Sequence, residues 1–189
     1  MLQKCFEARS PTLQRMVHSN MSINLIIFSN ASHRYGLGII YYRQEKFAMA
    51  EHYFKKALAI NKYNSVLYCY IGMALQAQGK IREALRELST ALSIDPRNSL
   101  AKFKKASVLT SLGEYPKALE ELEMLQDWAP KEAPILYLMG RIYKKLNKLN
   151  EAMNSFSMAH DVDSKHPMIK AAIEKLNQKD EPDESDELI

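Results

Sequence analysis

The sequence predicts an all-α fold, a solenoid of four stacked helical hairpins followed by a C-terminal capping helix. A fixed period of 34 residues carries most of this prediction, because small and apolar residues return at the same positions of every repeat. The composition agrees, since 47% of the residues are apolar and the good helix formers Leu, Ala, Lys and Glu are plentiful. The recurring positions are Gly38, Ala50, Phe54 and Ala57, then Gly72, Ala84, Leu88 and Ala91, then Ala106, Ala118, Leu122 and Leu125, and finally Gly140, Ala152, Phe156 and Ala159.

The first two repeats, 31–64 and 65–98, are each predicted to form a helical hairpin. In the first, apolar residues recur at helical spacing on both sides of a polar break at 44–46. In the second, Gly79 marks the break, because glycine readily adopts the left-handed conformation that ends helices. The helices are expected at 31–43, 47–60, 65–78 and 81–94.

The third and fourth repeats, 99–132 and 133–166, follow the same plan. Gly113 separates the two helices of the third repeat. Pro116 and Pro134 fall in the first turns of helices, where a missing amide hydrogen costs nothing. The helices are expected at 99–111, 115–127, 133–146 and 149–161.

One more amphipathic segment, 167–178, comes after the fourth repeat and has no partner helix behind it. A stack of repeats leaves its last apolar face bare, and a terminal helix is needed to cover that face. The segment is therefore predicted to be a capping helix.

The two ends of the chain do not follow the repeat. Residues 1–30 carry none of the recurring positions, which predicts an irregular or weakly helical N-terminal segment. Residues 179–189 are predicted to be a disordered acidic tail. The net charge of the chain is +4, and residues 180–189 hold six acids and no Lys or Arg, so the first 179 residues carry +10.

Several kinds of function find no support in the sequence. Cys5 and Cys69 form no disulfide or metal motif, and the five histidines have no metal-ligand spacing. No nucleophile motif or dinucleotide fingerprint is present, so we expect no enzyme, no catalytic residue, no metal and no cofactor. We also expect no nucleic-acid or membrane partner, since there is no Arg-rich run, no aromatic nucleic-acid signature and no apolar run long enough to span a bilayer.

The repeat resembles the tetratricopeptide repeat (TPR). It has small residues at repeat positions 8 and 20, a small residue at position 27 in three copies, an aromatic residue at position 24 in the first and last copies, and Pro at position 32 in two copies. Four copies keep this register over residues 31–166. The resemblance implies a curved TPR solenoid whose first helices line an inner groove.

A more specific resemblance is carried by five phrases of the sequence, at 35–47, 102–109, 118–123, 129–132 and 140–146. Their order and spacing resemble the C-terminal repeats of the third, cell-division-cycle TPR subunit of the anaphase-promoting complex (cyclosome). Members of that family are much longer and hold many more repeats.

The TPR resemblance also implies which residues face the groove, because positions 2, 5, 9, 12 and 13 of each repeat do so in TPR proteins. The resulting surface is aromatic at one end and basic at the other, which suits an extended peptide with apolar anchors and an acidic group. A guanidinium such as that of Arg141 can bind a carboxylate through two parallel hydrogen bonds. The predicted groove residues are Tyr35, Ile39, Tyr42, Arg43, Cys69, Met73, Gln76, Phe103, Ser107, Arg141, Lys144 and Lys145.

Two functional hypotheses follow from these resemblances. The first is a non-catalytic scaffold subunit of the anaphase-promoting complex, in nucleus and cytoplasm, which binds activator C-terminal tails and other subunits to support cell-cycle ubiquitin ligation. The alternative is a free-standing TPR adaptor, similar to a co-chaperone, which binds peptide tails. In the family that the sequence resembles, activator proteins end in an Ile-Arg tail, whose arginine side chain would need acidic partners. The predicted groove residues include no Asp or Glu. The resemblance therefore leaves two places for the tail site, either in these repeats or in other repeats of that family.

Overall fold

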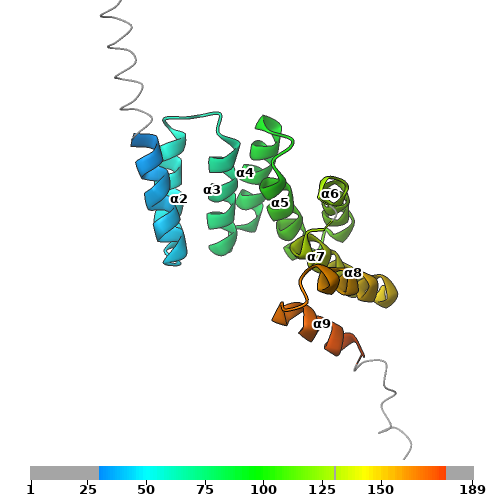
Figure 1. The fold of residues 1–189 in the computed structure, drawn as a ribbon. Coiled ribbons are helices and arrows are strands. Elements are labelled where there is room, and N and C mark those ends of the chain that lie inside the picture. The colour runs from blue at the N-terminus through cyan, green and yellow to red at the C-terminus, as the bar shows by residue number, and fades with distance from the viewer. Residues whose placement is uncertain (1–29, 130, 178–189) are drawn as a thin grey trace, which may run out of the picture.

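The structure, a computed structural model, describes residues 30–129 and 131–177. All regular secondary structure within them is helical, which confirms the all-α prediction. Helical residues 30–43 begin a single row of hairpins, and α9 ends it (Figure 1). The N-terminal segment up to residue 29 and the acidic tail 179–189 lie outside the described residues. The helices are α2 (Phe47–Leu58), α3 (Ser65–Ala77), α4 (Ile81–Ile94), α5 (Ser99–Ser111), α6 (Tyr115–Trp128), α7 (Ala133–Lys145), α8 (Leu149–Val162) and α9 (Pro167–Asn177).

The helix bounds lie within two residues of the predicted ones. In each hairpin the first helix packs on the second, so that α3 contacts α4, α5 contacts α6 and α7 contacts α8. Successive hairpins meet through α2 with α3, α4 with α5 and α6 with α7. The first helices also contact one another, α3 with α5 and α5 with α7. Among the helices of the described part, none combines the length and apolar character that a membrane crossing requires.

The recurring positions of the sequence form the core. All sixteen are buried, and the largest of them, Phe54 and Phe156, are at most 1% exposed. Helix α9 closes the stack at the C-terminal end, as the fold prediction requires. Its Ile169 packs in a cluster with Leu136 of α7, and its Leu176 packs in a cluster with Phe156 of α8.

Small residues allow the two helices of a hairpin to approach closely. A Cβ added at Gly140 would lie 2.6 Å from Cε1 of Phe156, and one added at Gly72 would lie 2.7 Å from Cγ of Leu88. Such separations are far below van der Waals contact in a close-packed interior, so an alanine would displace the large residue opposite. The periodic glycines therefore set the spacing of the two helices within their hairpins.

The four turns inside the hairpins repeat one backbone feature. Glu45, Gly79, Gly113 and Asn147 all have positive φ, at 60°, 78°, 78° and 59°, and each is 34 residues from the next. Two of these residues are glycines, and asparagine tolerates the left-handed region better than most side chains. Glu45 is the poorest choice of the four, because its Cβ crowds the following carbonyl oxygen in this conformation.

We predict that Glu45→Gly stabilises the protein by about 1 kcal/mol. The left-handed conformation costs a residue with a side chain about 1–2 kcal/mol, and the extra freedom of glycine in the unfolded chain offsets part of that gain. Urea unfolding should show a higher midpoint at an unchanged slope. The reverse change, Gly79→Ala, should lower the midpoint. A lower midpoint for Glu45→Gly would contradict the assignment of strain to this turn.

Candidate functional site

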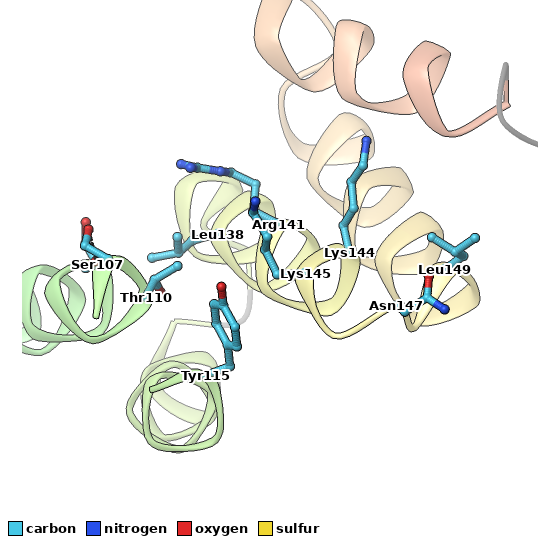
Figure 2. Close-up of a pocket in the computed structure, with 10 residues that line it drawn as sticks. Ser107, Thr110, Tyr115, Leu138, Arg141, Lys144, Lys145, Asn147 and Leu149 are labelled. Atoms are coloured by element: carbon cyan, nitrogen blue, oxygen red, sulfur yellow. Dashed lines mark hydrogen bonds between the residues drawn. The ribbon is translucent and has the colours of Figure 1, made fainter. Parts of the chain in front are cut away.

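A cavity of about 440 Å³ opens between α5, α6 and α7 at the C-terminal half of the row. Figure 2 shows Ser107 and Thr110 reaching it from α5, Tyr115 rising from α6, and Leu138 and Arg141 lying on α7. Its full lining is Ser107, Thr110, Ser111, Tyr115, Leu138, Arg141, Lys144, Lys145, Asn147 and Leu149. The site therefore combines an apolar floor with hydroxyl groups and three cationic side chains.

Two smaller cavities continue this surface toward α9. One, of about 240 Å³, is lined by Phe103, Tyr137, Arg141 and Met168 among others, and its walls come from α5, α7 and α9. The other, of about 300 Å³, also contains Tyr137, Arg141 and Met168 and adds residues of α9 as far as Lys175. We call the surface lined by these three cavities the C-terminal groove.

The spacing of residues on α7 explains why its cations gather in the C-terminal groove. Arg141, Lys144 and Lys145 are three and four residues apart, which places them on neighbouring positions of one helix face. Gly140 is buried against Phe156 of α8, whereas Arg141 and Lys145 are exposed. Lys144 and Lys145 also lie in the last turn of α7, where the helix dipole favours positive charge.

The electrostatic balance of the C-terminal groove is positive. Its lining includes Arg141, Lys144, Lys145 and Lys175, and Asp163 is the one acidic residue among the described residues that line the three cavities. Within residues 30–129 and 131–177, none of these four cations has a carboxylate within 4.0 Å. The carboxylate of Asp163 already accepts a hydrogen bond of 3.3 Å from the backbone N–H of Lys165. An acidic ligand would therefore meet cations that the described residues leave without ion pairs.

His166 adds a polar atom that lacks a partner. It occupies the repeat position of Asn64 and Asn98, whose side chains accept hydrogen bonds from backbone N–H groups at the starts of α3 and α5. In contrast, Nδ1 of His166 is buried and has no hydrogen-bond partner among the described residues. Because His166 also lines the cavity of about 240 Å³, a polar group of a ligand there would be close to it.

The structure brings five of the predicted groove residues together: Phe103, Ser107, Arg141, Lys144 and Lys145 all line the C-terminal groove. Gln76 of α3 lies beside them, and its Nε2 donates a hydrogen bond of 3.3 Å to Oγ of Ser107. Their exposure ranges from half-buried to exposed, so a ligand can reach them. These five residues thus lie on one concave surface, and the binding of a ligand there stays a prediction.

The predicted aromatic end has a different character. Tyr35, Ile39, Tyr42 and Met73 pack as half-buried residues against the core of the first hairpins. The ring of Tyr35 lies 5.5 Å from that of Tyr70, and burial, together with the neighbouring Tyr70 side chain, raises the pKa of Tyr35 to about 12. Burial also raises the pKa of Tyr42. Much of the surface of the Tyr35 and Tyr42 rings is therefore packed between helices. Arg43 is exposed at the C-terminal end of its helix and lines none of the three cavities.

The assignment of Cys69 to the groove is wrong. Cys69 is 0% exposed and belongs to the core cluster of the first hairpins, and burial raises the pKa of its thiol to about 12. Phe103 and Tyr137 occupy the same repeat position and reach the C-terminal groove with their long side chains. The short thiol of Cys69 ends beneath its neighbours.

Sequence reasoning missed the contribution of α9. Met168 and Lys175 belong to the capping helix, and they form one wall of the C-terminal groove. The amphipathic pattern of α9 could have revealed this contribution. A helix that covers the last hairpin with its apolar face places its other residues beside the inner surface of that hairpin. Within the described part of the chain, no group of three or more His, Cys, Asp or Glu side chains is placed to hold a metal ion.

Comparison with family models places tetratricopeptide repeats at residues 31–64, 75–142 and 133–165. Among curated proteins, a segment of 51 residues is 49% identical to cell division cycle protein 27 homolog B of Arabidopsis thaliana. That match covers 27% of this chain and 7% of the relative.

Several solved structures are similar in fold. MamA (residues 41 to the end) from Desulfovibrio magneticus has a TM-score of 0.71 at 23% identity, covering 79% of this chain and 85% of that one. PilF of Pseudomonas aeruginosa has a TM-score of 0.75 at 18% identity, with 81% and 70% covered. YrrB, described as a TPR protein with an unusual peptide-binding site, has a TM-score of 0.66 at 22% identity, with 85% and 88% covered. At these identities the likeness concerns the fold alone.

Proposed function

Because the chain is a tetratricopeptide-repeat protein, we propose that it is a scaffold whose C-terminal groove holds an acidic peptide segment of a partner protein. The observation that carries this proposal is the charge of the groove. Arg141, Lys144, Lys145 and Lys175 surround apolar cavities, and Asp163 is the one acid among the lining residues that the structure describes. Arginine and lysine bind carboxylates through charge-assisted hydrogen bonds, which are stronger than neutral ones.

The apolar part of the groove supports a ligand with mixed chemistry. Phe103, Tyr137, Leu138 and Met168 line the cavity of about 240 Å³ beside Arg141. An extended peptide can place one apolar side chain in this cavity and a carboxylate on the guanidinium. Apolar anchors surrounded by a few polar groups are typical of peptide and ligand sites.

We further propose that the scaffold belongs to the anaphase-promoting complex, where it would bind other subunits and activator tails in the nucleus and cytoplasm. Support comes from the five sequence phrases and from the 51-residue match to cell division cycle protein 27 homolog B. The positive groove suits an acidic segment of a neighbouring subunit better than the arginine side chain of an Ile-Arg tail. A free-standing adaptor that binds acidic tails is the alternative, and the same positive charge favours it.

We predict that a fluorescein-labelled peptide ending in Glu-Glu-Val-Asp binds the purified chain with a Kd of about 10–100 µM. Fluorescence anisotropy would measure this affinity, and a peptide ending in Ile-Arg with no acidic side chain should bind less tightly. The affinity should fall as salt is raised, because the Debye length shortens from about 10 Å at 0.1 M to about 3 Å at 1 M. Equal or tighter binding of the Ile-Arg peptide would contradict the assignment of an acidic ligand.

Affinity purification of the tagged chain from cells distinguishes a subunit of the anaphase-promoting complex from a free-standing adaptor. Recovery of ligase subunits together with the chain is expected if it is a subunit of the complex. Recovery without any of them, combined with binding of the Glu-Glu-Val-Asp peptide, would favour the free-standing adaptor.

A further inference from the structure

We propose that the acidic segment 180–187 of this same chain occupies the C-terminal groove and competes there with the acidic peptide of a partner. The inference rests on the proposed function, because it names a second ligand for the same groove. It would make the binding of partners conditional on displacement of the chain's own segment.

The charges of the segment and of the groove are complementary. Residues 180–187 contain six acidic side chains and no basic one. The C-terminal groove presents Arg141, Lys144, Lys145 and Lys175, and the carboxylate of Asp163 is engaged with the backbone of Lys165. The segment and the groove therefore carry opposite charges of similar density. The neighbouring Leu188 and Ile189 supply apolar side chains of the kind that the cavity beside Arg141 can accept.

Helix α9 lies between the groove and the acidic segment in the chain. This helix forms one wall of the groove through Met168, Ala171, Ala172 and Lys175. Lys175 is two residues before the end of α9 at Asn177, so the chain continues from the edge of the groove toward segment 180–187. The cations therefore lie near the last described residue of α9, which is three residues before the acidic segment in the sequence.

The reach of the chain is sufficient. Ten residues, 178–187, span up to about 33–36 Å when extended. Helix α7 has 13 residues and is about 20 Å long. The acidic segment can therefore turn back along α7 and place several carboxylates near Arg141 and Lys144 without a strained connection.

Tethering makes even weak binding effective. A short flexible linker gives an effective concentration of about 1 mM. If the free segment binds with a Kd of about 0.1 mM, the groove is filled about nine-tenths of the time. An added peptide then binds about tenfold more weakly than it would to an empty groove.

The test uses the full chain and a labelled synthetic peptide with the sequence of residues 179–189. In the tail-neutralised variant, every acid from 180 to 187 is replaced by its amide, Asp→Asn and Glu→Gln. We expect this variant to bind the peptide about tenfold more tightly than the unmodified chain. A control variant keeps all six acids of 180–187 but permutes the order of the residues. It should bind the peptide like the unmodified chain if charge is what holds the segment.

Combining the tail-neutralised variant with charge reversals elsewhere in the chain distinguishes occupation of the groove from a general charge effect. With Arg141→Glu and Lys144→Glu present, neutralising the tail should change the peptide affinity less than twofold, because the groove no longer holds the segment. With Arg82→Glu and Arg86→Glu on α4, the same charge change elsewhere, the tenfold difference should remain. Loss of the difference in the α4 background as well would overturn the proposal.

The outcomes separate this inference from the proposed function. Equal peptide affinity for the unmodified and tail-neutralised chains would overturn the inference and leave the peptide-binding groove intact. Failure of the tail-neutralised chain to bind this peptide and the Glu-Glu-Val-Asp peptide would contradict the proposed function itself. A molar mass that rises with concentration in sedimentation for the unmodified chain, but not for the neutralised one, would show binding between copies and overturn the intramolecular arrangement.

Discussion

Replacing Phe156 by alanine is expected to lower the free energy of unfolding by about 3–5 kcal/mol, the range for removing a buried phenylalanine. Phe156 is 1% exposed. Its ring fills the space that Gly140 leaves on α7, and its centroid lies 5.6 Å from that of Tyr137. The substitution would remove this packing and leave a cavity between α7, α8 and α9. Urea unfolding followed by circular dichroism would measure the loss.

Met158→Ala is the matched control for this prediction. Met158 lies on the same helix and is 39% exposed. Surface substitutions of this kind usually change stability by no more than about 0.5 kcal/mol. Equal losses for the two variants would mean that the periodic aromatic positions are not the core of the stack.

Reversing two charges in the C-terminal groove, with Arg141→Glu and Lys144→Glu, is expected to weaken binding of the acidic peptide about 100-fold. This corresponds to about 2.7 kcal/mol, at about 1.4 kcal/mol for each factor of ten. The variant loses two attractive charges and gains two repulsive ones, while the partial exposure of the site limits the effect. Fluorescence anisotropy with the Glu-Glu-Val-Asp peptide would measure it.

The control for the charge reversal carries the same change elsewhere. Arg82 and Arg86 are exposed on α4, and their replacement by Glu alters the net charge by the same amount. This variant should keep its peptide affinity within about twofold. If both variants lose affinity equally, the attraction comes from net charge alone and the groove has no special role. Unfolding midpoints close to that of the unmodified chain would show that both variants fold.

The sequence predicted the fold well because the 34-residue period reports a physical requirement that recurs in each hairpin. Gly38, Gly72 and Gly140 allow close approach of helices, and the large residue opposite each of them fills the space that remains. Those positions are constrained by packing, so the pattern is strict and the helix bounds follow from it.

The site was predicted less completely, since exposure depends on how far a side chain extends as well as on its repeat position. Phe103 and Cys69 share one position, yet the ring reaches the groove and the thiol is buried. Repeat positions also say nothing about α9, whose Met168 and Lys175 complete the groove from outside the repeats. The positive φ of Glu45 could not be predicted from the sequence either, because glutamate is not typical of left-handed turns. The closure of the hairpin imposes that conformation.

An NMR titration of the isotope-labelled chain with the acidic peptide would show directly whether the C-terminal groove binds it. If the C-terminal groove is the binding site, backbone amide shifts should concentrate on α5, α7 and α9, near Ser107, Arg141 and Met168. Shifts confined to helical residues 30–43 and α3, or no shifts at about 1 mM peptide, where even a Kd of 1 mM gives half occupancy, would contradict it.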